Sequence, residues 1–173
     1  MHHHGYLWTG PKERFDDEAL RRPPHPEPPP PPGPDDPAAE RLFRRYRDVA
    51  SEFPVVDLPP LETAYWLIKP RSLIRGSWSD PEEAAVWLGE RLDEFASRFA
   101  NDWEREGGWL SARVDSAAER LRCGGDVSLG VYLEHPAFLS LAVVTCSPNS
   151  GRGELPCPAA GNGGQGSGTA QVV

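Results

Sequence analysis

The strongest apolar periodicity in the chain runs over residues 80–106 and predicts one long helix. The polar pair Ser79-Asp80 precedes Pro81, which is typical of a helix start, and Gly107-Gly108 is typical of a helix end. Apolar side chains at spacings of three and four form one stripe: Ala84, Leu88, Leu92, Phe95, Ala96, Phe99 and Trp103. We expect this stripe to pack across a sheet, with Phe95 nearly fully buried.

A second amphipathic pattern predicts a helix that begins at Pro37, is capped by Asp35 or Asp36, and ends near Phe53. Its apolar face comprises Ala39, Leu42, Phe43, Tyr46, Val49 and Ala50. Residues 109–122 fit both a helix and, over their first part, an alternating strand. The good helix formers in their second half favour the helix.

Four further stretches have the apolar and branched composition of strands, namely residues 64–68, 72–78, 127–133 and 139–146. The last two flank a His135-Pro136 turn and should form an antiparallel hairpin. Residues 4–9 predict an edge strand, although the histidines at residues 2–4 are also typical of a purification-tag remnant. The order of elements predicts an α+β fold, with a small antiparallel or mixed sheet of about three to five strands packed by two or three helices.

Two segments of biased composition interrupt this pattern. Ten of the fifteen residues 23–37 are proline, and seven of the eighteen residues 151–168 are glycine. Such segments cannot bury enough apolar surface to offset the entropy of ordering them, so we expect both to be disordered. The predicted organisation is an N-terminal segment at 1–22, a Pro-rich linker at 23–36, an α+β domain at 37–148 that a piece of the N-terminal segment joins, and a Gly-rich tail at 149–173.

The charge and the hydropathy of the chain narrow the class of partner. The formal net charge is −8 at pH 7, which disfavours nucleic acid and anionic membranes and suits a basic protein partner. No apolar run approaches the roughly 18 residues of a membrane span, and the N-terminus lacks the pattern of a secretory signal, so we expect a cytoplasmic protein. Basic residues that are nearly all arginine, with abundant alanine, glycine and proline, indicate a high-GC bacterial genome.

Few side chains are candidates for chemistry. The cysteines Cys123, Cys146 and Cys157 form no C-x-x-C pair and match no zinc spacing, so the sequence predicts free thiols and no metal site. A small enzyme is an alternative hypothesis, in which the hairpin brings Cys146 and His135 together with Asp126 and Glu134. The competing interpretation of Cys146 is a buried, inert side chain. No phosphate loop, nucleophile elbow or zinc-protease motif occurs, and we predict no catalytic residue and no cofactor.

Aromatic and cationic side chains outside the apolar stripes are the binding candidates. Trp78 and Trp87 lie off the stripe of the long helix, and exposed tryptophans are enriched at binding hot spots. A second layer of core is the alternative role for them. Arg41, Arg44 and Arg45 lie together in the helix predicted to begin at Pro37, where arginine can hold phosphate or stack on a base. A solvated helix face is the competing interpretation.

Together these patterns favour a non-enzymatic cytoplasmic interaction or accessory protein, analogous to the immunity proteins that neutralise a toxin. The expected partner is another protein, with nucleic acid disfavoured and no membrane. The small enzyme, and RNA or nucleotide binding through the Arg41–Arg47 helix, are the alternatives.

Overall fold

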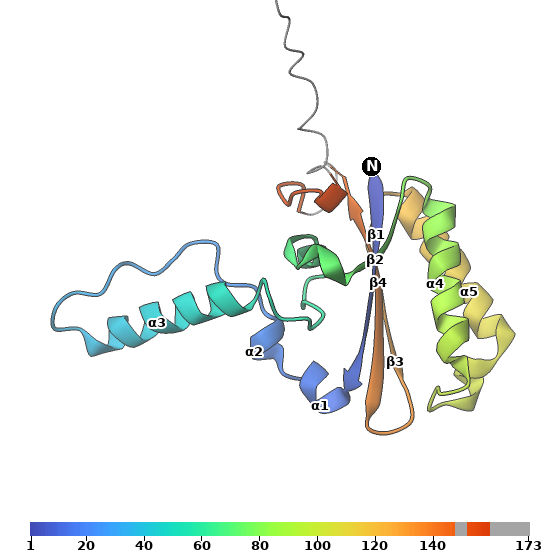
Figure 1. Cartoon of the computed structure of the whole chain (residues 1–173), viewed down its shortest axis with the longest axis horizontal. Coiled ribbons are helices and arrows are strands. Elements are labelled where there is room, and N and C mark those ends of the chain that lie inside the picture. Colours follow the sequence, from blue (N-terminus) through green and yellow to red (C-terminus); the bar gives the residue numbers. More distant parts are fainter. Residues whose placement is uncertain (148–151, 160–173) are drawn as a thin grey trace, which may run out of the picture.

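A four-stranded antiparallel sheet forms the centre of the molecule, whose computed structural model describes residues 1–147 and 152–159. The strands are β1 (His2–Pro11), β2 (Ile74–Trp78), β3 (Val127–Tyr132) and β4 (Ala137–Cys146), and their order is β2-β1-β4-β3. Helices accompany this sheet (Figure 1), so the predicted α+β class with a small antiparallel sheet is confirmed. The β3–β4 hairpin also lies where the sequence predicts it.

The first strand is an inner strand, and the expectation of an edge strand at residues 4–9 is wrong. All ten residues of β1 pair with β4, while its first half pairs with β2 on the other side. The cause is burial on both faces, because the side chains of His3, His4 and Tyr6 are at most 1% exposed. The interpretation of residues 2–4 as a purification-tag remnant does not explain why His3 and His4 are buried in an inner strand. One of the two inner strands of the sheet therefore comes from the chain before the Pro-rich linker.

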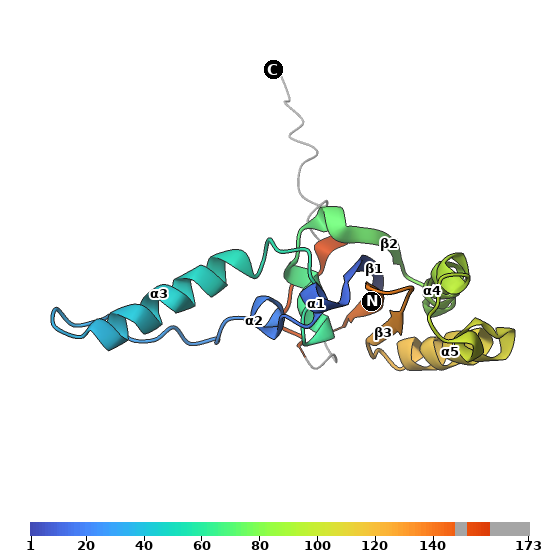
Figure 2. The ribbon, with the colours of Figure 1, turned by 90° about the horizontal axis from the view of Figure 1, so that it is seen from below.

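Two helices, α4 (Pro81–Ala96) and α5 (Gly107–Arg122), cover one face of the sheet side by side (Figures 1 and 2). Asp80 caps α4 as predicted, since its carboxylate accepts a hydrogen bond from the backbone N–H of Glu82. The helical interpretation of residues 109–122 is confirmed by α5. The side chains of Leu88, Leu92 and Leu121 are fully buried in the core between these helices and the sheet.

The long helix predicted over residues 80–106 ends at Ala96. The chain then turns so that Phe99 forms an isolated antiparallel bridge with Leu133, and η3 (Asp102–Arg105) is a separate 3-10 turn. The bridge requires extended backbone, and the phase of the predicted stripe is lost there. Phe99 is therefore 0% exposed, whereas Phe95 is only partly buried and Trp103, predicted in the core, is 54% exposed.

The opposite face of the sheet is covered by a 3-10 helix, η1 (Thr63–Ile68), where the sequence predicts a strand at 64–68. Trp66 stacks on Tyr6 of β1, with ring centroids 4.7 Å apart and ring planes 12° apart. Only Trp66 and Leu67 of the apolar run are buried, and they lie in another conformation than the one predicted, because a short apolar run suits either one. A second 3-10 turn, η2 (Arg71–Leu73), leads from η1 into β2.

An arm projects from these layers (Figures 1 and 2). We use "arm" for residues 23–52, which comprise the Pro-rich linker and α3 (Pro37–Glu52). Two short helices, α1 (Lys12–Phe15) and α2 (Glu18–Arg21), lead into it. The linker contains no helix or strand and runs beside α3. Asp36 caps α3 as predicted, accepting hydrogen bonds from two backbone N–H groups of its first turn.

Lys69 holds the segment that follows the arm, residues 53–56, against the rest of the molecule. Its ammonium group donates hydrogen bonds to the backbone carbonyls of Phe53 and Val56, the latter at 3.1 Å. The same nitrogen lies 4.0 Å from the centre of the Phe53 ring. Burial of this cation lowers the pKa of Lys69 to about 8.

Within residues 1–147 and 152–159, no helix has the length and hydropathy that crossing a membrane requires. Most of the predicted tail at 149–173 lies outside the described residues. Its described part, residues 152–159, lies against the end of β4.

Candidate functional site

The two tryptophans proposed as binding residues contact each other beside the sheet. Trp78 ends β2 and Trp87 lies on α4, with ring centroids 5.3 Å apart. Both are partly buried and pack against the core of α4 and α5. Gly5 of β1 makes room for them, since a Cβ there would lie 2.8 Å from the Trp87 ring and 3.0 Å from the Trp78 ring. The pair therefore extends the core to the surface, as the alternative role for these residues foresees.

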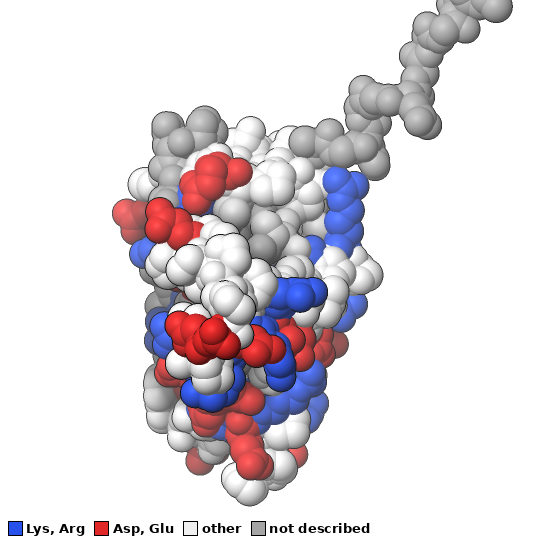
Figure 3. Space-filling view, turned by 90° about the vertical axis from the view of Figure 1, so that its left-hand side faces the viewer, with Lys and Arg blue, Asp and Glu red and all other residues white. Residues whose placement is uncertain are grey.

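The three arginines proposed as binding residues lie exposed on α3 of the arm. Arg44 pairs with Glu40 at 2.9 Å as an exposed i,i+4 ion pair. Arg45 lines a groove described below, and Arg41 faces solvent. On the face of the molecule that the arm presents, basic and acidic side chains alternate (Figure 3). That face offers no continuous basic surface of the kind that nucleic acid requires.

A groove of about 710 Å³ lies where the arm begins, between α2 and the first half of the Pro-rich linker on one side and the second half of α3 on the other. Its walls are mainly apolar and include Pro23, Pro24, Pro29, Leu42, Tyr46 and Val49. None of the sixteen residues of α3 is buried, and Leu42 is 58% exposed. Of the apolar face that predicted this helix, Leu42 is exposed and the other five residues are only partly buried.

The four residues of the small-enzyme hypothesis do not come together, and that expectation is wrong. His135 and Glu134 lie at the β3–β4 turn, whereas Cys146 lies at the far end of β4. A strand of ten residues spans roughly 30 Å, so the turn places imidazole and thiol at opposite ends. Asp126 lies near Cys146 in the sheet, but its carboxylate accepts the backbone N–H of Thr145 at 2.8 Å.

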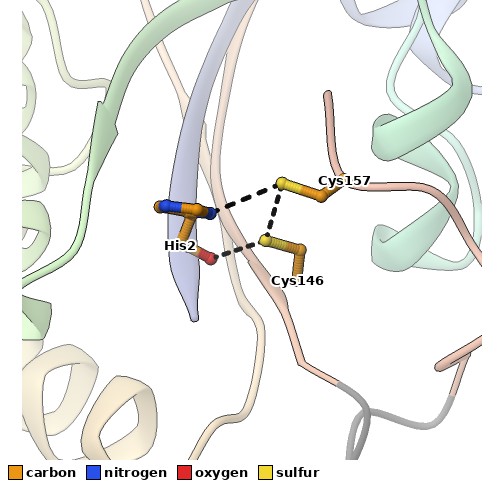
Figure 4. A group of neighbouring side chains, drawn as sticks. All are labelled: His2, Cys146 and Cys157. Carbon is orange, nitrogen blue, oxygen red and sulfur yellow. Dashed lines mark hydrogen bonds between the residues drawn. The ribbon is translucent and has the colours of Figure 1, made fainter. Parts of the chain in front are cut away.

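Cys146 instead lies among other thiol and imidazole groups at one end of the sheet (Figure 4). Its Sγ lies 3.1 Å from Cys157 Sγ and 3.6 Å from His4 Nε2. Cys157 Sγ in turn lies 3.5 Å from His2 Nδ1 and 3.6 Å from His4 Nε2. We call His2, His4, Cys146 and Cys157 the thiol–imidazole cluster. The sequence prediction of no metal site did not foresee it.

The surroundings of the cluster keep His4 neutral, and both of its ring nitrogens contact polar atoms. Burial, together with the nearby His2 and His3, lowers the pKa of His4 to about 4. Its Nδ1 lies 2.7 Å from Ser77 Oγ, which leaves Nε2 facing the two sulfur atoms. Burial and the contact with Cys157 raise the pKa of Cys146 to about 11, so the thiol keeps its proton at neutral pH in the absence of a cation.

One sequence signal for the cluster exists, but it is incomplete. His2 and His4 are two residues apart, so on a strand they share a face. Only the register of β1 against β4, which places His2 opposite Cys146, brings a thiol to that face. Cys157 joins from a segment without helix or strand at that position, and no periodicity could place it there.

Comparison of the chain with models of protein families, with curated proteins and with solved structures found no match.

Proposed function

We propose that this chain is a non-enzymatic interaction protein that binds a partner protein through the groove of its arm. The observation that carries the proposal is the exposure of α3: an amphipathic helix of sixteen residues that buries none of them. Exposed apolar patches of this kind mark interaction surfaces, because leaving them in water is unfavourable. The partner would supply the burial that the rest of the chain does not.

The shape and the lining of the groove indicate the kind of partner. The first half of the Pro-rich linker forms one wall of the groove, and the second half of α3 forms the other. Such a groove fits the apolar face of an amphipathic helix, which binds through side chains one turn apart. Arg45 and Glu52 also line it and would select for charges of both signs on the partner.

Two features support a protein partner over nucleic acid or a membrane, and we propose that this partner is cytoplasmic. The net charge of −8 repels phosphate backbones and anionic lipids. The face shown in Figure 3 carries basic and acidic side chains mixed together, and Arg44 of α3 pairs with Glu40. Neutralisation of the partner, as immunity proteins neutralise toxins, is the form of interaction that we propose by analogy.

The test compares two aspartate variants that introduce the same charge at equally exposed apolar positions. Leu42→Asp lies in the groove, where Leu42 is 58% exposed, and Val86→Asp lies on α4, where Val86 is 56% exposed. Each protein, carrying a C-terminal tag without histidine, is used to capture partners from lysate of its own host. The captured protein is then purified and its affinity measured by calorimetry.

We expect the unmodified chain and Val86→Asp to bind the same purified partner with equal affinity, and Leu42→Asp to bind it at least about tenfold more weakly. Equal binding by both variants would remove the groove from the proposal. A dimer of the chain itself that Leu42→Asp dissociates would also contradict it, since the occupant would then be a second copy.

A further inference from the structure

The thiol–imidazole cluster gathers four donor atoms of the kinds that bind zinc at one end of the sheet. Ligand atoms of His2, Cys146 and Cys157 all lie within 4.8 Å of one another, and His4 Nε2 is 3.6 Å from both sulfurs. A zinc ion with bonds of about 2.3 Å to sulfur and about 2.0–2.1 Å to nitrogen separates its donors by roughly 3.3–3.8 Å. Three sulfur–nitrogen distances of 3.5, 3.6 and 3.6 Å lie within that interval. The two sulfur atoms are 3.1 Å apart, so they would have to move apart slightly to hold the ion.

The sheet itself builds this arrangement. His2 and His4 project from one face of β1, and Cys146 lies directly opposite His2 on β4. Figure 4 shows the side chains of His2, Cys146 and Cys157 pointing toward one another from three separate stretches of chain. Two of the three stretches are sheet strands held by a full ladder of hydrogen bonds, so three of the four donors are positioned before any ion binds.

Neighbouring groups orient the donors as they do around known metal ligands. A ligating histidine usually engages its second ring nitrogen with a polar partner, which fixes the ring. Ser77 Oγ occupies that place for His4, at 2.7 Å from Nδ1. The buried hydroxyl of Tyr6, two residues along the same face, has no hydrogen-bond partner among the described residues.

We propose that His2, His4, Cys146 and Cys157 bind a zinc ion. Two thiolates and two imidazoles form the donor set that a borderline-soft divalent cation prefers over the hard ions magnesium and calcium. Four protein ligands leave no open position, so the ion would be structural. Its effect would be to fasten residues 152–159, which carry Cys157, to the end of the central strands.

The test uses the full chain, purified through a tag without histidine and kept reduced. Co²⁺ and Zn²⁺ are titrated in turn, with Mg²⁺ as the negative control, and Co²⁺ is followed by its visible absorption. Cys157→Ser removes one donor from a segment outside the sheet, so the fold is not at risk. Cys123→Ser is the matched control, because Cys123 is exposed and lies outside the cluster. Ser77→Ala removes only the group that orients His4.

We expect one Co²⁺ per chain, with the intense visible bands of a tetrahedral site and a thiolate charge-transfer band, displaced by one Zn²⁺. Cys123→Ser should bind like the unmodified chain. Cys157→Ser should lose more than about 100-fold in affinity, since even an outer partner such as Ser77 accounts for about 10–100-fold. Equal affinity of Cys157→Ser and Cys123→Ser, or weak octahedral Co²⁺ spectra in the unmodified chain, would overturn the proposal. Neither result depends on the arm, whose variants leave the cluster intact.

Discussion

Replacing Phe99 by alanine tests the most consequential difference between the predicted and the observed helix. The sequence places Phe95, Phe99 and Trp103 on one stripe of one helix. In the structure α4 ends at Ala96, and Phe99 enters the core from an extended stretch bridged to Leu133. The three side chains are therefore buried to different degrees, and each should contribute differently to stability.

The expected loss in unfolding free energy for each alanine variant follows from the burial of the side chain that it removes. Phe99 is 0% exposed and makes an edge-on contact with Trp109, with ring centroids 6.0 Å apart. Truncation of such a side chain costs about 3–5 kcal/mol in lost transfer free energy and in the cavity left behind. Phe95 is partly buried, so Phe95→Ala should cost roughly 1–2 kcal/mol. Trp103 is 54% exposed, and Trp103→Ala should cost less than about 1 kcal/mol.

Urea unfolding monitored by circular dichroism measures all three variants against the unmodified chain. With a slope of about 2 kcal/mol per molar urea, the loss expected for Phe99→Ala lowers the midpoint by about 1.5–2.5 M. The slope should stay unchanged, which makes the midpoints comparable. If Trp103→Ala proved as damaging as Phe99→Ala, the helix would continue past Ala96 and the turn described above would be wrong.

Two further predictions concern close packing and a buried cation. Gly5→Ala should destabilise the fold by about 1–3 kcal/mol, because the new methyl group would lie 2.8 Å from the Trp87 ring. Gly33→Ala is the control: a Cβ there has nothing within 4 Å, so stability in the same urea assay should change by less than about 0.5 kcal/mol. Similar losses for both variants would exclude the tryptophan contact. Burial lowers the pKa of Lys69 to about 8, so above that pH the folded chain has released a proton that the unfolded chain keeps up to about pH 10.4. The stability of the unmodified chain should therefore rise relative to Lys69→Met between pH 8 and pH 10, and a difference that stays constant over that interval would contradict the depressed pKa.

The elements that the sequence predicts correctly are those whose signal is local. The caps of α3 and α4, the periodicities of α3, α4 and α5 and the alternation of β3 each lie within one stretch of chain, so the types of these elements follow from the residues themselves. The start of α5 does not, because Gly107-Gly108, interpreted as a helix end, begins it. The end of α4 depends on Leu133, a residue outside the helix, and could not be read from the stripe.

The thiol–imidazole cluster and the inner position of β1 depend on register between distant strands. His2 meets Cys146 only because β1 pairs with β4 along its full length. Cysteine spacing in the sequence matches no zinc pattern, since two of the donors are histidines that precede both cysteines by most of the chain. The groove of the arm could not be predicted either. The apolar face of an amphipathic helix shows that something must pack against it, but not whether that surface belongs to the same chain.

The pairing of β1 with β4 also orders the events of folding. His3 and Thr145, neighbours across these strands, are 142 positions apart in the chain. During synthesis β1 emerges first, and the strand that pairs with it along its whole length emerges only after both covering helices. Contacts between such distant residues form slowly, because a long loop must close before they gain any stabilisation. The apolar faces of α4 and α5 consequently have no complete sheet to cover until β4 has arrived, and the molecule should acquire its core in one late step.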